Sequence, residues 1–282
     1  MEASLLLTVF FFGTNFTAVK FVVADVPPVL FAAARFTLAG LLLFAVSRFA
    51  EPGTRLLRKD FVPVLGLGVV GVTLTQTVFT VGVGLTTAAN TALVYSTSPV
   101  WGMLLGFALG IERPRLAGIL GIGLSLLGVG FIVYGGLEFA GTSLVGDVLI
   151  LGAAVFWGSY TVLSLGLLER YPPISLAAYA MTLGGLVAFP VSLLDPHQLD
   201  LAALDATTWA AAAYSMLFSS AFGFAAWGWG VSRAGANRVL IYQYLVTLIG
   251  VSAGILLLGE SFGPGQLIGA AVIVAGVYLA KR

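Results

Sequence analysis

The longest stretch of the chain without a charged residue runs from Phe61 to Ile111, a length of 51 residues. As a single helix rising 1.5 Å per residue, it would measure about 76 Å. About 20 apolar residues suffice to cross the hydrocarbon core of a bilayer, which is about 30 Å thick. The stretch therefore predicts two membrane-spanning helices joined by a turn, which we place at residues 82–87. Only 9% of the chain is charged, whereas soluble domains carry about 25%, so a soluble fold is excluded.

Other apolar stretches each fit one crossing. Eight of them lie outside the long stretch, and one keeps a single charge, Arg35, in its interior. With the two helices of the long stretch, they predict an all-α integral membrane protein with ten transmembrane helices. The eight stretches are Ala3–Val19, Pro27–Ser47, Leu116–Leu137, Val148–Leu168, Tyr171–Leu194, Ala206–Ser232, Val239–Gly259 and Ser261–Ala280.

The basic residues are confined to alternate loops of this arrangement. Eleven of the 13 Lys and Arg residues lie in loops two–three, four–five, six–seven and eight–nine or at the C-terminus, and the opposite loops hold none. Because cytoplasmic loops are enriched in Lys and Arg, we expect both termini to face the cytoplasm from an inner, plasma membrane. The opposite loops hold acidic residues instead, namely Asp25, Glu138, Asp147, Asp195, Asp200, Asp205 and Glu260.

The composition also excludes several kinds of chemistry. The chain has no Cys, so it can form neither disulfides nor thiolate, Fe–S or Cys-zinc sites. Its single His, His197, stands among acidic residues in a predicted loop, which excludes a His-rich metal site. The net charge of +1 gives no reason to expect a nucleic-acid partner. We therefore expect no metal and no cofactor.

The two halves of the chain resemble each other at a nearly constant offset. Gly13 and Gly158 stand in similar aromatic surroundings, 145 positions apart, and the same offset places Gly40 on Gly185. A drift of three residues along the chain is what loop insertions produce, so the pattern predicts two repeats, residues 1–138 and 139–282. Further pairs, at offsets of 147 and 148, are Asn90/Asn237, Tyr95/Tyr242, Glu112/Glu260, Gly121/Gly269 and Gly128/Gly276.

Each predicted repeat contains five helices. Because five is an odd number, the second repeat starts on the opposite side of the membrane, and the two repeats are inverted about an axis in the membrane plane. Inverted repeats are typical of transporters, in which two halves rock around a site and expose it to each side in turn. The sequence thus predicts an alternating-access transporter.

The linked motifs of the two repeats resemble a known family. They are an aromatic-Gly-x-Asn/Tyr opening, a Pro-Pro and Thr-Leu-x-Gly second helix, a Gly-Glu end of the fourth helix, and residues 266–269 with 276–278. Over nearly the whole chain they are similar to the duplicated EamA domain of the drug/metabolite transporter superfamily, and most of all to YddG-type exporters of aromatic and other neutral amino acids. The resemblance implies a ten-helix, basket-like fold with helices five and ten at the periphery and a cavity lined by the others.

Charged residues inside the predicted spans are few. Every Asp and Glu lies at or beyond a span end, so we expect no buried-acid proton relay and predict facilitated diffusion or weak coupling. Lys20, near the outer end of the first helix, either attracts a substrate carboxylate or snorkels to the headgroups. Arg35, about 10 Å inside the second helix, either binds a substrate carboxylate or bonds to a helix end. We include Arg35 in the candidate site.

Aromatic residues in the middle of predicted helices are further candidates. No headgroup explains Tyr95, Trp101, Trp157, Tyr160 and Tyr179, and their polar atoms need partners that a cavity with water or substrate supplies. Their rings suit an aromatic side chain and an ammonium group. For each residue taken singly, helix–helix packing is the alternative.

Two residues complete the candidate site. Asn15 lies near the middle of the first helix and aligns with Tyr160, and a buried amide has several hydrogen bonds to satisfy. Pro99 lies within the fourth helix and should kink it, whereas the matching residue of the ninth helix is Val246. We therefore predict Pro99 to be a hinge of a moving helix, with a static kink as the alternative.

These features predict an exporter of aromatic and other neutral amino acids that acts as a monomer, with a small-molecule substrate and the lipid bilayer as its partners. The alternative is export of lipophilic drugs or organic cations through the same cavity. A remote alternative is an integral-membrane enzyme, which is disfavoured because acid–base catalysis needs positioned titratable groups that the predicted interior lacks.

Overall fold

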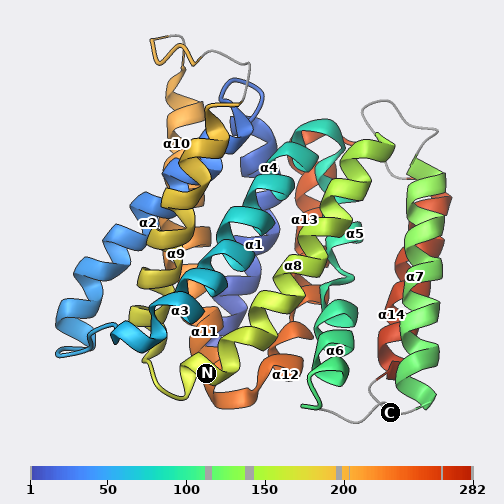
Figure 1. The fold of residues 1–282 in the computed structure, drawn as a ribbon. Coiled ribbons are helices and arrows are strands. Elements are labelled where there is room, and N and C mark those ends of the chain that lie inside the picture. The colour runs from blue at the N-terminus through green and yellow to red at the C-terminus, as the bar shows by residue number, and fades with distance from the viewer. Residues whose placement is uncertain are drawn as a thin grey trace.

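The computed structural model describes residues 2–111, 116–136, 143–194, 199–202, 204–261 and 263–280. Within these residues all regular structure is helical (Figure 1), and there is no strand. Seven helical stretches are long and apolar enough to cross a membrane, which confirms the all-α membrane fold at this level. They are Ala3–Val22, Pro28–Ala50, Arg58–Leu85, Leu144–Leu168, Pro173–Ser192, Ala206–Ala234 and Ala236–Leu258.

Residues 2–136 form two long helices, then a third that contains a π-helical segment, η2, then two short helices and a final long one. The bounds are α1 Glu2–Val22, α2 Pro28–Ala50, the 3-10 helix η1 Arg58–Asp60, α3 Phe61–Gly68, η2 Val69–Leu74, α4 Thr75–Leu85, α5 Ala88–Tyr95, α6 Ser98–Ala108 and α7 Leu116–Gly136.

Residues 144–280 follow the same order of long helices, π-helical segment and short helices. The π-helical segments η2 and η3 begin at Val69 and Ser215, 146 positions apart. The bounds are α8 Leu144–Leu168, α9 Pro173–Ser192, α10 Ala206–Tyr214, η3 Ser215–Phe222, α11 Gly223–Ala234, α12 Ala236–Leu240, α13 Gln243–Leu258 and α14 Pro264–Ala280.

The long uncharged stretch divides in two, as predicted. α3, η2 and α4 are continuous, and the chain turns at Thr86 and Thr87 before α5. The Thr87 hydroxyl accepts a hydrogen bond from Asn90 N at 3.1 Å and so caps α5. The other three predicted crossings correspond to α5 with α6, to α7 and to α14, which are not among the seven long apolar stretches. The count of ten therefore stays a prediction.

Helix interruption occurs in both halves. Pro99 lies in the first turn of α6, directly after a break in the helix. The corresponding helix of the second half also breaks, between α12 and α13, although Val246 and not a proline stands at its matching position. Each break is closed by a tight bond from residue i to residue i−3, from Thr97 N to Val94 O and from Tyr242 N to Val239 O. The break thus belongs to this place in the fold and does not require proline.

Repeat-related helices pack directly against each other. At the contact of α2 with α9, a Cβ on Gly40 would lie 2.5 Å from Thr182 Oγ1, and one on Gly185 would lie 2.3 Å from Thr37 Oγ1. α7 and α14 form a second such pair at the edge of the molecule (Figure 1). Glycine is needed at the α2–α9 contact because the helices approach more closely than a Cβ allows.

The bundle has two ends that differ in charge. α1 begins and α14 ends at the lower end in Figure 1, which we name the basic end. It includes the loops at residues 51–60, 169–172 and 233–235. The opposite end, which we name the acidic end, includes residues 23–27, 86–87 and 259–261.

Candidate functional site

A small cavity lies at the centre of the bundle, between helices of both halves. Its volume is about 40 Å³, which is room for about three water molecules. Seven of its 13 lining residues are aromatic and none is acidic. A larger ligand therefore requires the surrounding helices to move. The lining residues are Phe12, Asn15, Phe16, Arg35, Phe36, Gln76, Phe79, Tyr95, Trp157, Ser219, Phe224, Gln243 and Val246.

Arg35 brings a positive charge to the wall of this cavity. It lies two turns into α2 and is 3% exposed. Its Nη1 donates to Ser215 Oγ and its Nη2 to Gln76 Oε1, both at 2.7 Å. Ser215 Oγ in turn donates to Asn15 Oδ1 at 2.5 Å. Four polar side chains from α1, α2, α4 and η3 are thus linked across the bundle.

The partners of Arg35 are all neutral. Its Cζ lies 5.1 Å and 4.6 Å from the ring centroids of Phe31 and Phe36, which are cation–π contacts. Within the described residues, its Nε has no hydrogen-bond partner and no carboxylate forms an ion pair with it. A buried cation is costly unless an anion compensates its charge. The site is therefore suited to an anionic group.

Two further lining side chains have unpartnered polar atoms. Gln243, the first residue of α13, is 1% exposed, and neither its Oε1 nor its Nε2 has a partner in the described part of the chain. The same holds for Trp157 Nε1. Buried polar atoms are normally hydrogen-bonded, so an occupant of the cavity would supply what these atoms lack.

Aromatic rings make up much of the cavity wall. Trp157 stacks on Tyr160 with ring centroids 5.3 Å apart, and Phe224 meets it edge-on at 5.1 Å. Such rings bind flat apolar groups and, through their faces, cations. A second group of rings, with centroids 5.5 to 6.0 Å apart, consists of Phe16, Phe79 and Tyr95.

At the acidic end, three charged residues hold the turn between α4 and α5. Lys20 Nζ donates to three carbonyl oxygens around the end of α4, at 2.5 to 3.3 Å. Glu260 accepts hydrogen bonds from the first two N–H groups of α5, at 2.6 and 2.7 Å. Asp147 Oδ1 accepts from Thr86 Oγ1 at 2.9 Å and from Asn90 Nδ2 at 2.5 Å. Lys20 and Glu260 each meet the helix end that suits their charge. We name Lys20, Asp147 and Glu260 the acidic-end lock.

The acidic-end lock corrects two expectations. Lys20 does not line the cavity, and its Nζ instead caps a helix end. Asp147 was expected in a loop, but α8 begins earlier, at Leu144, where the Ser143 side chain caps it. Asp147 therefore falls within the first turn of α8 and is 1% exposed, so one acidic residue is buried in a span, although it does not line the central cavity.

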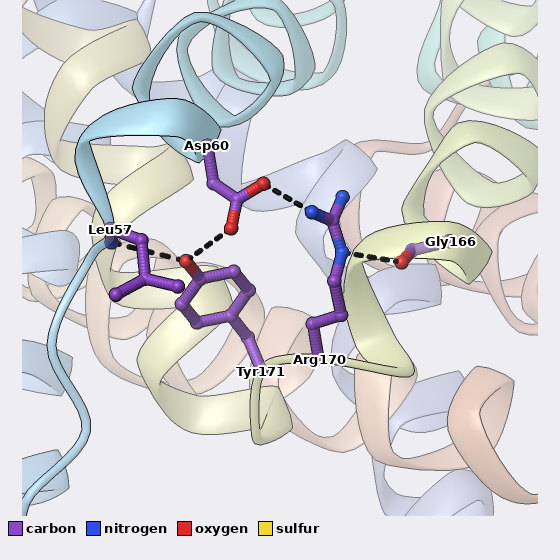
Figure 2. Close-up of polar contacts among 5 residues, drawn as sticks. All are labelled: Leu57, Asp60, Gly166, Arg170 and Tyr171. Atoms are coloured by element: carbon purple, nitrogen blue, oxygen red, sulfur yellow. Dashed lines mark hydrogen bonds and ion pairs between the residues drawn. The ribbon is translucent and has the colours of Figure 1, made fainter.

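At the basic end, a polar cluster ties the loop before α3 to the turn between α8 and α9. Figure 2 shows Asp60 paired with Arg170 and accepting a hydrogen bond from Tyr171 OH at 2.8 Å. The Tyr171 oxygen accepts from Leu57 N at 3.1 Å. Burial, together with the bond to Asp60, raises the pKa of the Tyr171 hydroxyl. The Arg170 side chain, however, is 47% exposed.

Wider cavities lie near the basic end. One of about 430 Å³ separates α3 from α8, and one of about 650 Å³ lies among α1, α2, α9 and α11. The second is lined by Glu51, whose carboxylate accepts hydrogen bonds from the N–H groups of Ile174 and Ser175 at 3.1 and 2.7 Å and so caps α9. Two cavities that are wider than the central one thus lie beside helices at the basic end.

Comparison with known proteins identifies the family. The model of the EamA-like transporter family matches residues 2–134 and again residues 144–282. The chain belongs to the EamA-like transporter family. The two matches cover nearly all of this EamA transporter, as the sequence resemblance implied.

Relatives of this EamA transporter are similar over almost their whole length. An uncharacterized transporter of Archaeoglobus fulgidus is 31% identical over 278 residues, which cover 98% of this chain and 95% of that protein. A probable amino-acid metabolite efflux pump of Salmonella typhimurium is 28% identical, with 97% and 92% covered. A solved structure titled "Crystal structure of protein" has the same fold, with a TM-score of 0.72 at 20% identity and coverage of 99% and 96%. The names of the relatives indicate transporters rather than enzymes.

In this EamA transporter, four of the predicted site residues line the cavity, namely Asn15, Arg35, Tyr95 and Trp157. Tyr160 lies beside Trp157 and is not a lining residue.

Trp101 and Tyr179 lie away from the cavity. Trp101 Nε1 donates to Thr97 Oγ1 at 3.2 Å, because the break before α6 sets a new direction for that helix. Tyr179 OH donates to Thr54 O at 3.4 Å, because α9 begins only at Pro173 and its second turn is still near the basic end. The hinge role of Pro99 stays a prediction.

The sequence analysis missed several lining residues. Phe12 and Phe16 share a face of α1 with Asn15, and the helical spacing around Asn15 was a signal that could have found them. Gln76 and Gln243 are polar residues inside long apolar helices, which is an equally available signal.

Proposed function

We propose that this EamA transporter exports aromatic and other neutral amino acids by alternating access through the central cavity. The observation that carries the proposal is the cavity wall, where a buried and uncompensated Arg35 stands among seven aromatic residues. A zwitterionic amino acid supplies a carboxylate for the guanidinium group and a side chain for the rings. The name of the Salmonella relative supports the same class of substrate.

The proposed architecture is ten crossings in two inverted repeats, residues 1–138 and 139–282, acting as a monomer. Three observations support it: the shared order of elements in the two halves, the related positions of η2 and η3, and the packing of α2 on α9 and of α7 on α14. The distribution of Lys and Arg supports a cytoplasmic basic end and a location in the inner membrane.

In the proposed cycle, substrate enters from the basic end while the acidic-end lock keeps the other end closed. The halves then rock around the occupied cavity, and the lock opens to release the substrate outside. The helix breaks, one of them at Pro99, and the two π-helical segments supply places where the backbone can bend.

Export of organic cations is disfavoured by Arg35. Two like charges 4 Å apart repel by about 4 kcal/mol at an effective dielectric constant of 20, which corresponds to nearly a thousandfold weaker binding. Enzymatic activity also lacks support, because the cavity lining contains no His, Asp or Glu.

The test is flux into proteoliposomes. Radiolabelled phenylalanine, leucine and alanine should show protein-dependent flux, and a quaternary ammonium dye should not. Arg35→Met should lower the amino-acid flux at least about tenfold, since a charge-assisted bond to a carboxylate contributes about 1.5–3 kcal/mol. Arg55→Met, at an exposed loop position, is the matched control. Absence of flux for every amino acid would refute the proposal.

We also propose that transport does not depend on a proton relay through the cavity, because its lining includes no carboxylate. The proton gradient is dissipated while the substrate gradient is held fixed, and the rate should be unchanged. A collapse of the rate would instead indicate coupling, and Asp147 would be the first residue to test.

A further inference from the structure

We propose that Gln243 is the second polar anchor of the central site and binds the ammonium group of a substrate whose carboxylate Arg35 holds. This inference rests on the proposed function and narrows it, because a substrate must then carry both groups. The two anchors come from different halves of the chain, Arg35 from α2 and Gln243 from α13.

Packing alone does not account for an amide at this position. Gln243 is almost completely buried, and both of its amide atoms lack partners in the part of the chain that the structure describes. Ser98, 145 positions earlier, is likewise the first residue of its helix, and its hydroxyl donates to Tyr95 O at 2.5 Å. The residue that begins the helix after the break in the first half is thus satisfied within its own segment, whereas Gln243 is not. A leucine would fill a similar volume without burying an unpaired amide.

Gln243 also provides the free acceptor that an ammonium group needs. Three amide side chains line the cavity, and the oxygens of two are already engaged: Gln76 Oε1 by Arg35 and Asn15 Oδ1 by Ser215. The Gln243 oxygen is unpartnered. The ring faces of Phe16 and Tyr95, which line the same cavity, add cation–π attraction.

Two anchors make the site selective by the cost of leaving one of them unpaired. An analogue without the ammonium group leaves the Gln243 oxygen buried and unsatisfied, and one without the carboxylate leaves Arg35 uncompensated. Sites that hydrogen-bond a substrate group reject analogues that lack it, since the polar atoms of the site then remain unpaired.

The test measures binding to the purified full-length protein by isothermal titration calorimetry. Phenylalanine and leucine are each compared with their deaminated acid and their decarboxylated amine. The wild type should bind each amino acid at least tenfold more tightly than either analogue. Gln243→Leu should lose the preference over the deaminated acid and keep the preference over the amine, and Arg35→Met should show the reverse.

Ser98→Ala is the matched control and should leave both preferences unchanged. Thermal unfolding supplies a second readout: Gln243→Leu should unfold at the same or a higher temperature, because it removes an unpaired amide. Unchanged selectivity in Gln243→Leu, or a lowered unfolding temperature, would overturn the inference and make the amide a structural group. Amino-acid flux through the wild type would persist in that case, whereas failure of the proposed function would abolish it.

Discussion

The acidic and basic ends of the bundle are built from repeat-related helices, yet they pack differently. At the acidic end, a Cβ on Gly82 of α4 would lie 2.8 Å from Ile150 Cδ1 and 3.1 Å from Gly146 O, both in α8. The repeat-related contact at the basic end is equally close, because a Cβ on Gly230 of α11 would lie 2.8 Å from Leu5 Cδ2 of α1, whereas a Cβ on Gly228 of the same helix would have nothing nearer than Pro173 Cβ at 3.6 Å. The two ends thus share one tight glycine contact, and α11 adds a loose position at Gly228 near the basic end.

The charged residues also differ between the two ends. The acidic-end lock brings residues from α1, α8 and the end of α13 to one turn, and Asp147 within it is fully buried. The basic-end ion pair of Asp60 joins a half-exposed Arg170, beside wide cavities. Sequence repetition thus preserves some contacts and not others. Such a difference is what the proposed alternating access requires, because a bundle that rocks about its centre closes one end as it opens the other.

The largest effect is expected from breaking the acidic-end lock. Lys20→Met leaves three carbonyl oxygens at the end of α4 without their donor, which should open the acidic end. Val246→Cys supplies a thiol in the cavity of a chain that has none. A membrane-impermeant thiol reagent on the acidic side should label it about tenfold faster in the Lys20→Met background, since 1–2 kcal/mol changes an equilibrium 5- to 30-fold. The exposed Lys59→Met is the control, and equal rates in both would show that the lock does not hold this end closed.

The second prediction compares the loss of stability caused by alanine at Gly82 and at Gly228. Gly82→Ala should lower stability by about 1–3 kcal/mol through overpacking against α8. Gly228→Ala should be neutral or stabilising by up to about 1 kcal/mol, because alanine favours helix. Thermal unfolding in detergent measures both changes. Equal losses in the two variants would show that the ends are packed alike.

A smaller effect is expected at the basic end. Asp60→Asn removes the charge pairing with Arg170 but keeps an oxygen that can accept the Tyr171 hydrogen bond. Because Arg170 is half exposed, the loss should be below about 1 kcal/mol. Flux should stay within about twofold of the wild type. A larger loss of stability in Asp60→Asn than in Gly82→Ala would show that the basic-end cluster contributes more to stability than the packing at the acidic end.

The smallest effect separates the ends by pH. Hydrogen bonds from Thr208 lower the pKa of Asp205 at the acidic end. The Asp205 carboxylate therefore contributes fully to folding stability above the usual pKa of about 3.9, and this contribution is lost as pH falls through the lowered pKa. The pKa of Tyr171 at the basic end is raised. The protonated Tyr171 hydroxyl therefore contributes fully to folding stability below about pH 10, and this contribution is lost as pH rises through the raised pKa. In thermal unfolding against pH, Asp205→Asn should flatten only the acid limb and Tyr171→Phe only the alkaline limb. The same curve for wild type and variants would remove both assignments.

Four of the predicted site residues line the central cavity, and particular residues explain why these and not the others do so. Arg35 and Asn15 were identifiable because a charge or an amide deep in an apolar stretch needs a special environment. Nothing in the sequence separates Trp101 and Tyr179 from the other site candidates, because the depth and direction of their side chains depend on where α6 and α9 begin. Gln243 was recognisable in the same way, as an amide in an apolar stretch, but its place in the cavity wall depends on the helix break before α13, which no proline in the sequence marks.

The sequence by itself determined that the chain is an all-helical membrane protein, where its long uncharged stretch turns, and which residues bring polarity into its interior. These follow from the cost of placing charge and unpaired backbone in hydrocarbon, which each segment meets on its own. Only the tertiary structure decided that Lys20, Asp147 and Glu260 meet at one turn, and that Gln243 shares a cavity with Arg35. Hydrogen bonds and close packing depend on which surfaces come within a few ångströms, and in these cases the partners lie more than 50 residues apart in the chain.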